Sequence, residues 1–281
     1  MKKIVSLLLA ALMVATMCFG LASCNPPEAG GGETGDWAKI QDQGYFYCGI
    51  TLYEPMNYYN DDGDLVGFDT EFAQAVAAEL GVEAKFVTIT WGSKYLELNS
   101  GAIDFIWNGY TFGDESDGTP RSDYVDFTYA YLNNSQCIVT ASDKLATWNT
   151  KEAFAGLRGA AEGGSAGEAV AKELAGENGS YTPVAAQTNA LMELKAGTID
   201  FAVIDVLMAE AMVGQGDFTD LAINNAYTPE PEVYAIGCRK GSDMTAKVNE
   251  AILKLVENGK LAEIAAKYDL SDALIQNIGA N

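Results

Sequence analysis

The sequence predicts an α/β protein of two lobes, each with a mostly parallel sheet flanked by helices. Strand-like and helix-like stretches alternate between residues 44 and 107, an order that favours a parallel sheet. A helix followed by a strand recurs 96 residues further along the chain, which is the length of a domain. The chain of 281 residues is long enough for two such domains.

The first strand is expected over residues 44–51, before a loop, because Pro55 disfavours helix in the residue that precedes it. Residues 60–64 (NDDGD) are turn formers and predict the tip of a hairpin. Asp69 is then expected to cap a helix that runs to Leu80.

A second strand over residues 82–90 and a helix over 94–100 precede a short buried strand at 105–107. The polar residues Asn108, Gly109 and Thr111 follow its carboxyl end, where open α/β sheets bind ligands. Arg121 comes next, in a loop crowded with acids. It could clamp a carboxylate through two parallel hydrogen bonds, or merely neutralise its acidic neighbours.

The internal repeat supports the two lobes. Residues 97–105 (ELNSGAIDF) and 193–201 (ELKAGTIDF) share Glu, Leu, Gly, Ile, Asp and Phe. Each copy predicts a helix that ends at Gly and leads into a buried strand. The same offset pairs Gly109 with Asp205, so each lobe would present a polar group at the end of the equivalent strand. Two such ends facing each other would form a cleft.

Between the copies, residues 136–140 predict a strand, and the Gly-rich residues 159–167 open a helix over about 168–174. Free N–H groups at such a helix start suit an anion, although the turn could also be a plain helix opening. Residues 163–167 also match the pattern G-x-S-x-G, but the chain has no His to act as the base. A helix over 206–213, a strand over 233–239 and two amphipathic helices complete the expected elements.

Composition excludes several functions. A net charge of −22 argues against nucleic acid, whose phosphates need a basic surface. The absence of His excludes His-based acid–base catalysis and His-ligated metal sites. Cys48, Cys137 and Cys238 are expected to be buried without forming a disulfide or metal site. No catalytic residue, metal or cofactor is expected.

The amino terminus predicts a targeting segment. Lys2 and Lys3 precede an apolar run over residues 4–19, and LASC follows at 21–24. This tetrapeptide resembles the lipobox of bacterial lipoproteins, so residues 1–23 would be a signal peptide and Cys24 would carry lipid. Residues 24–36 are then a Pro- and Gly-rich tether.

Five short stretches occur in a characteristic order along the chain: Leu65–Asp69, Asn108–Thr111 with Arg121 and Val125–Phe127, Gly164–Ser165, Ala202–Asp205 and Tyr234–Gly241. Through these stretches, the sequence from about Trp37 to Leu270 resembles the extracytoplasmic solute-binding proteins of amino-acid ABC importers, in the family-3, polar amino-acid group. It implies a type II periplasmic-binding-protein fold, with lobe 1 formed by 37–131 and 231–281 and lobe 2 by 132–230. Strands near 129–133 and 228–232 would cross between the lobes and act as hinges.

The resemblance also implies the roles of residues in a cleft between the lobes. Arg121 would clamp the ligand α-carboxylate, with Thr111 and the Ser165 turn. Asp205 and the Gly109 carbonyl would accept hydrogen bonds from the α-ammonium group. The full set of expected binding residues is Tyr53, Trp91, Asn108, Gly109, Thr111, Arg121, Ser165, Ala166, Gln187 and Asp205.

The sequence departs from the family pattern at three places. Residues 113–120 look inserted before Arg121, and Ala166 stands where Ser or Thr is common. No Asp follows Gly49, so a cationic ligand is not supported at that position. Glu54, Glu162 and Gln187 all could read the ligand side chain.

The expected protein is thus a monomeric, lipid-anchored receptor outside the cytoplasm that delivers a free amino acid to an ABC permease. The alternatives are a dehydratase-like enzyme on the same scaffold and an extracellular sensor domain.

Overall fold

The computed structural model describes residues 35–228 and 230–280. The expected signal peptide, the lipidated Cys24 and most of the tether lie outside the described residues. Residues 35–281 form one unit by their internal contacts. No helix in the described part of the chain is long and apolar enough to cross a membrane.

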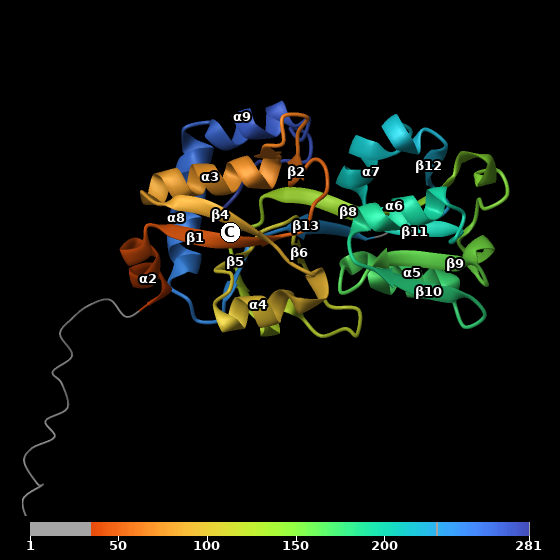
Figure 1. Cartoon of the computed structure of the whole chain (residues 1–281), viewed down its shortest axis with the longest axis horizontal. Helices are drawn as coiled ribbons and strands as arrows, with labels where there is room; N and C mark the ends of the chain where they lie inside the picture. Colours follow the sequence, from red (N-terminus) through yellow and green to blue (C-terminus); the bar gives the residue numbers. More distant parts are fainter. Residues whose placement is uncertain (1–34, 229, 281) are drawn as a thin grey trace, which may run out of the picture. The chain divides into compact units, whose positions relative to one another are not determined.

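Helices and strands alternate along most of the described chain (Figure 1). The α-helices are α2 (Asp36–Gln43), α3 (Phe68–Leu80), α4 (Lys94–Ser100), α5 (Ala166–Ala175), α6 (Gln187–Lys195), α7 (Val206–Met212), α8 (Met244–Glu257) and α9 (Lys260–Lys267). The strands are β1 (Tyr45–Ile50), β2 (Tyr58–Tyr59), β3 (Leu65–Val66), β4 (Glu83–Thr88), β5 (Phe105–Ile106), β6 (Thr111–Phe112), β7 (Val125–Phe127), β8 (Leu132–Ala141), β9 (Arg158–Glu162), β10 (Ser180–Val184), β11 (Phe201–Asp205), β12 (Leu221–Asn224), β13 (Pro231–Tyr234) and β14 (Gly237–Arg239). Short 3₁₀ turns are η1 (Trp91–Ser93), η2 (Arg121–Asp123), η3 (Ser142–Lys144), η4 (Lys151–Phe154) and η5 (Gly216–Phe218).

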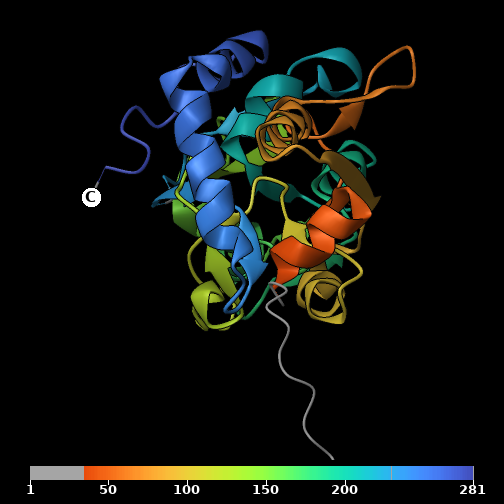
Figure 2. The same cartoon turned by 90° about the vertical axis from the view of Figure 1, so that its left-hand side faces the viewer.

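The first sheet has the strand order β4-β1-β5-β14-β7. Strand β1 runs parallel to β4 and to β5, as the alternation of strands and helices predicts. Helices α3 and α4 lie on opposite faces of this sheet (Figure 1), and α8 and α9 pack on α3 (Figure 2). The β2–β3 hairpin confirms the turn predicted at residues 60–64.

The second sheet has the order β10-β9-β11-β8-β13-β6, and β12 also pairs with β8. Strands β10, β9 and β11 are parallel, whereas β8 runs antiparallel to β11, β12 and β13. Helices α5 and α6 cover this part of the sheet on opposite faces (Figure 1).

The repeat seen in the sequence is confirmed. Helix α4 leads into β5 and α6 leads into β11. Gly101 and Gly197 follow the two helices with φ angles of 78° and 73°, a conformation that costs glycine little. The same short pattern therefore produces the same helix–turn–strand unit twice.

Strands β8 and β13 lie side by side and connect the two groups of elements (Figure 1). The register pairs Leu132 with Tyr234 and Ser135 with Pro231. The predicted single strand over 233–239 is wrong, because β13 belongs to the second sheet and β14 to the first. The change of sheet falls at Ala235, whose N–H donates to the Tyr110 carbonyl at 2.9 Å.

Asp69 does not cap α3, which corrects another expectation. The residue before this helix is Gly67, with φ of 126°, and Asp69 lies inside the first turn, fully buried. The Asp69 carboxylate accepts a hydrogen bond from the Gly109 N–H at 2.6 Å and from the Tyr131 hydroxyl at 3.1 Å. Asp69 thus supports the loop that follows β5 from behind.

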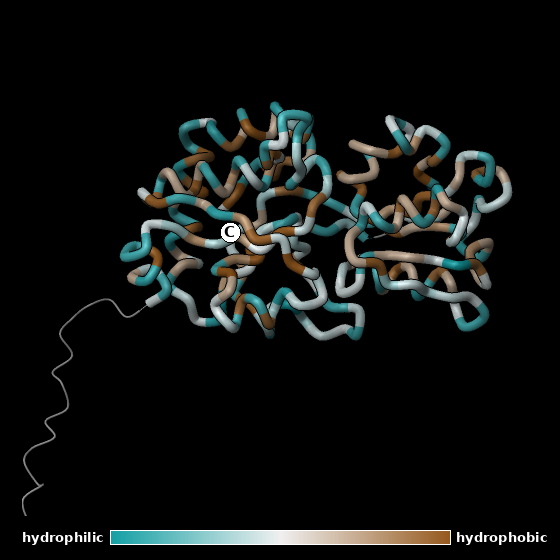
Figure 3. The backbone as a smooth tube through the Cα atoms, in the orientation of Figure 1, coloured by the Kyte–Doolittle hydropathy of each residue, from teal (hydrophilic) through white to brown (hydrophobic). Residues whose placement is uncertain are grey.

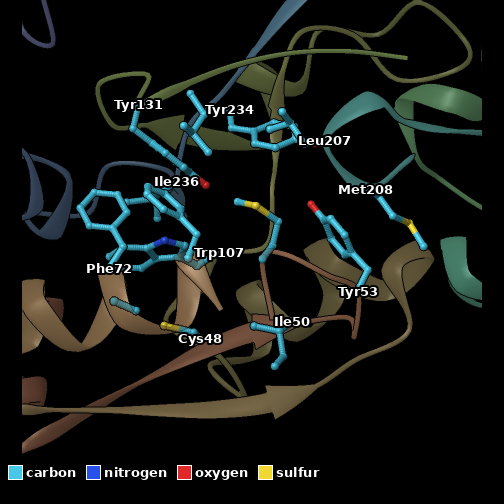
Figure 4. Packing of buried hydrophobic residues seen from close by; sticks show 14 of the residues in the cluster. Cys48, Ile50, Tyr53, Phe72, Trp107, Tyr131, Leu207, Met208, Tyr234 and Ile236 are labelled. Atoms are coloured by element: carbon cyan, nitrogen blue, oxygen red, sulfur yellow. The ribbon is translucent and has the colours of Figure 1, made fainter. Parts of the chain in front are cut away.

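Hydrophobic residues concentrate on the strands at the centre of each sheet, and hydrophilic residues on the outer turns (Figure 3). All five residues of β11 are buried. Cys48, Cys137 and Cys238 are buried, as predicted, and all three are free. Figure 4 shows the aromatic side chains of Phe72, Trp107 and Tyr131 close together in the core.

Candidate ligand-binding site

Nine of the ten binding residues predicted from the sequence line one polar cavity. They are Trp91, Asn108, Gly109, Thr111, Arg121, Ser165, Ala166, Gln187 and Asp205, and the remaining lining residue is Glu162. Half of the lining residues precede β8 and half follow it. The cavity volume is only about 10 Å³, room for roughly one water molecule. The structure therefore holds this site closed.

Tyr53 does not line the cavity. It is almost fully buried next to Gly109, and a Cβ added at Gly109 would lie 1.8 Å from the Tyr53 hydroxyl oxygen. Figure 4 shows Tyr53 among core side chains, near Met208 and Leu207 of α7. Tyr53 therefore packs behind Gly109 in the core and does not contact the cavity.

Arg121 forms the cationic end of the cavity. Its side chain is 1% exposed, so it is not a solvated partner of the surrounding acids. Nη1 donates to the Thr111 carbonyl at 3.1 Å, and Nη2 lies 3.5 Å from the Gly164 carbonyl. The guanidinium also stacks over the Tyr110 ring, with its carbon 5.2 Å from the ring centroid.

The segment 113–120, which looked inserted, places Glu115 against Arg121. The Glu115 Oε1 atom lies 3.4 Å from Arg121 Nε and 3.1 Å from Lys94 Nζ. Lys94 also donates to the Gly164 carbonyl at 3.0 Å. Burial lowers the pKa of Lys94 to about 8, although the nearby Glu115 opposes the shift. The sequence contains no signal that would pair these three residues.

Ser165 and Ala166 supply the amino end of α5. Ser165 precedes the helix in an extended conformation, and Ala166 is its first residue. The first N–H groups of a helix lack partners within it and can bind an anion. Gly164 carries a φ of 78°, and an added Cβ would meet Gly92 at 3.3 Å, so the turn needs glycine there.

Asp205 forms the anionic end. Its Oδ1 accepts hydrogen bonds from Asn134 Nδ2 at 2.8 Å and from Gln136 Nε2 at 2.7 Å. Gln187 donates to Oδ2, and its Oε1 accepts from the Asp205 N–H at 2.8 Å. Burial raises the pKa of Asp205, and these amide donors oppose the rise. Because both ends of the Gln187 amide are engaged, Gln187 orients Asp205 rather than reading a ligand side chain.

Glu232 of β13 was not recognised in the sequence. Asn134 and Gln136 donate to Glu232 as well as to Asp205. Burial and the charge of Asp205 raise the pKa of Glu232 to about 7. Two carboxylates, Asp205 and Glu232, therefore share one pair of amides on the crossing strand β8.

Asn108 lines the cavity, but its side-chain amide forms hydrogen bonds with other protein groups. Its Oδ1 accepts from the Thr51 N–H at 2.9 Å, and its Nδ2 donates to Asn57 Oδ1 at 2.6 Å. These bonds fix the loop after β5.

Trp91 lines the cavity as predicted from the sequence. Its ring packs edge-on against the Tyr110 ring, with the two ring centroids 5.6 Å apart.

Glu162, the last residue of β9, is 2% exposed. Its Oε1 atom is buried and has no hydrogen-bond partner within residues 35–228 and 230–280. Burial and the charge of Asp205 raise the pKa of Glu162 to about 8, against the opposing effects of Lys94 and Thr51. Glu54, the other acid expected near the ligand, lies outside this cavity.

No group of His, Cys, Asp and Glu among residues 35–228 and 230–280 is arranged to hold a metal ion.

The two α/β sheets joined by crossing strands, with a polar cavity closed between them, define a solute-binding protein of the type II periplasmic class. Residues 48–271 match the family model described as "Bacterial extracellular solute-binding proteins, family 3", and the chain belongs to this family.

The chain is also similar to binding proteins whose names state the amino acid that they bind. The chain is 29% identical over 261 residues to the arginine-binding extracellular protein of Bacillus subtilis (strain 168), covering 92% of this chain and 95% of that protein. It is 26% identical to the L-cystine-binding protein TcyA of the same strain, covering 95% and 97%. It also resembles a substrate-binding protein of an ABC uptake transporter from Streptococcus pneumoniae solved with histidine, with a TM-score of 0.76, 29% identity and coverage of 86% and 99%.

Proposed function

We propose that this chain captures one amino acid between two lobes and delivers it to a membrane permease. The observation that carries the proposal is the placement of Arg121 and Asp205 on the wall of one cavity, both buried. A zwitterion needs a cation for its carboxylate and an anion for its ammonium group, and few other small solutes need both. The arginine-, cystine- and histidine-binding relatives support an amino-acid ligand.

The roles of the two ends follow from their donors and acceptors. The ligand α-carboxylate binds the Arg121 guanidinium and the N–H groups at the start of α5, which accounts for Ser165 and Ala166 in the cavity. The α-ammonium group donates to Asp205 and to the Gly109 carbonyl. Trp91 covers the bound ligand.

Ligand entry requires the cavity to open, since its present volume excludes an amino acid. Lobe 1 comprises residues 37–131 and 231–281, and lobe 2 comprises residues 132–230. Strands β8 and β13 are the connections about which the lobes rotate. Contacts that bridge the lobes, such as Lys94 with the Gly164 carbonyl and Thr188 with the Leu52 carbonyl, break on opening.

The activity is binding without turnover, at the outer side of the membrane, with the chain held there as a monomer by lipid on Cys24. An enzyme on the same fold would use Glu162, the buried acid with a raised pKa, as its general acid or base. Recovery of the ligand unchanged after incubation with the chain separates binding from turnover. Mass spectrometry of the membrane-bound chain, against a Cys24→Ala variant, tests the anchor.

The test of the function is thermal unfolding of the purified chain against each of the twenty amino acids. A ligand that binds only the folded state raises the midpoint by mass action, by about 2.7 kcal/mol in stability at a hundredfold excess over Kd. One or a few amino acids should stabilise the chain, and Arg121→Ala and Asp205→Ala should remove the effect. Stabilisation by no amino acid would exclude the proposal.

A further inference from the structure

We propose that the ligand carries a second positive charge on its side chain and that Glu162 binds it. The inference rests on the amino-acid-binding function proposed above, and it names the class of ligand: basic amino acids.

Two residues of the cavity lining, Glu162 and Arg121, have a buried side-chain atom without a hydrogen-bond partner among the described residues. Arg121 Nε still lies 3.4 Å from the Glu115 carboxylate, whereas Glu162 has no such neighbour within ion-pair distance in that part of the chain. Glu162 lines the cavity at the end of β9, is almost fully buried, and has one carboxyl oxygen without any hydrogen-bond partner. A buried polar atom without a partner destabilises a protein, so such atoms in a binding site mark where a ligand group binds. An ionised carboxylate only accepts hydrogen bonds, so the partner that satisfies ionised Glu162 is a donor.

The charges around the cavity indicate that this donor is a cation. The lining contains one base, Arg121, and two acids, Asp205 and Glu162. The two ends of a zwitterion pair with Arg121 and Asp205, so a Glu162 carboxylate, once ionised, has no partner of opposite charge from them. Lys94 does not supply this partner, since Lys94 already contacts Glu115 at 3.1 Å and donates to the Gly164 carbonyl. A cationic side chain on the ligand supplies the missing charge.

The other candidates for reading the side chain are accounted for. Glu54 lies outside the cavity, and both ends of the Gln187 amide bind Asp205. The residue after Gly49 is Ile50, an apolar side chain 1% exposed in the core. Recognition of a cation in this chain is therefore assigned to the second sheet, at Glu162.

Binding of a cation at Glu162 is coupled to the release of a proton. The groups that act on Glu162 are Asp205, Lys94 and the Thr51 hydroxyl, and Tyr53 and Tyr181 also lie within reach of its charge. Since burial and Asp205 raise the pKa of Glu162 to about 8, the empty site holds a proton there at pH 7. A bound cation lowers that pKa, so a basic amino acid releases a proton that a neutral one does not.

The experiment compares ligands that differ in charge and little else. Arginine and its neutral analogue citrulline form one pair, and lysine and norleucine form another. Titration calorimetry of the purified chain at pH 7, in two buffers of different ionisation enthalpy, measures affinity and proton release together. We expect the basic member of at least one pair to bind about 10- to 100-fold more tightly than its neutral analogue, with up to one extra proton released.

The variant Glu162→Gln keeps the size and hydrogen-bonding capacity of the side chain and removes its charge. We expect it to abolish both the preference for the basic ligand and the extra proton. Glu54→Gln, which removes an acid outside the cavity, should leave both unchanged.

Two failures can be told apart. If neutral amino acids bind and the basic ones bind no better, or if Glu162→Gln retains the preference, this inference is wrong while the amino-acid function stands. If neither basic nor neutral amino acids bind, the proposed function itself fails.

Discussion

The contact between Glu115, Lys94 and Arg121 predicts that Glu115→Gln lowers the stability of the ligand-free chain. One carboxyl oxygen lies 3.1 Å from Lys94 Nζ and 3.4 Å from Arg121 Nε. Both bases are at most 3% exposed and Glu115 is 14% exposed, so solvent screens this cluster weakly. The substitution leaves two buried cations with no acid in contact.

Removing one partner of a buried ion pair costs about 3–5 kcal/mol. Glutamine still accepts one hydrogen bond and Glu115 retains some exposure, so we expect a smaller loss of about 2–4 kcal/mol. For a chain of this size, 1 kcal/mol corresponds to about 2–4 °C in Tm. The expected drop in Tm is therefore roughly 5–15 °C, measured by differential scanning calorimetry at pH 7 without ligand.

Asp114→Asn is the matched control, because Asp114 is exposed in the same segment and forms no ion pair with the described residues. Its Tm should stay within about 2 °C of the unchanged chain. The α-carboxylate of a bound amino acid also neutralises the Arg121 charge. This charge lacks its Glu115 partner in Glu115→Gln, so a bound amino acid should raise the Tm of this variant more than the Tm of the unchanged chain. If Glu115→Gln and Asp114→Asn melt at the same temperature, the cluster contributes no net stability and the reasoning fails.

Three further predictions concern the site and its support. Asp205→Asn should weaken binding of every amino acid at least about tenfold in titration calorimetry, because the α-ammonium loses its charged acceptor; an unchanged Kd would remove Asp205 from the site. Gly109→Ala should lower Tm by several degrees or prevent folding, since Gly109 has a φ of 52° and Tyr53 occupies the space of a Cβ; a soluble variant with the same Tm would contradict this packing. Burial raises the pKa of Asp69 to about 7 and of Glu162 to about 8, so these two groups hold more protons in the folded chain than in the unfolded chain between about pH 4 and 8. The ligand-free Tm should therefore be higher at pH 5 than at pH 8, and Glu162→Gln should reduce this difference.

Local patterns in the sequence were sufficient for much of the fold. The pattern of apolar residues predicted β1, β4, β5 and the helix over 94–100. Such a pattern is local, because the apolar residues on the buried face of a strand or helix recur every two to four positions along the chain. The repeated Gly at the end of a helix predicted the second helix-to-strand unit, since positive φ is a local requirement. The expectation of one strand over 233–239 failed because pairing with two different sheets is not a local property.

Some residues of the candidate site could likewise be predicted from the sequence, and others could not. Asp205 could be identified because it ends β11, and Arg121 because it lies in the loop region beyond β5, near where open α/β sheets expose polar groups. Glu115 and Glu232 could not, because each lies in a stretch without periodicity and meets its partners only after the chain has folded. The sequence alone predicted that polar residues stand at the ends of two equivalent strands, with Asp205 at one end and Arg121 in the loop beyond the other. Only the tertiary structure decided which acids are buried beside Arg121 and Asp205, because burial and contact depend on residues up to about a hundred positions apart. Those long-range contacts set the pKa of each buried acid. They also leave Glu162 Oε1 without a hydrogen-bond partner in the part of the chain that the structure describes.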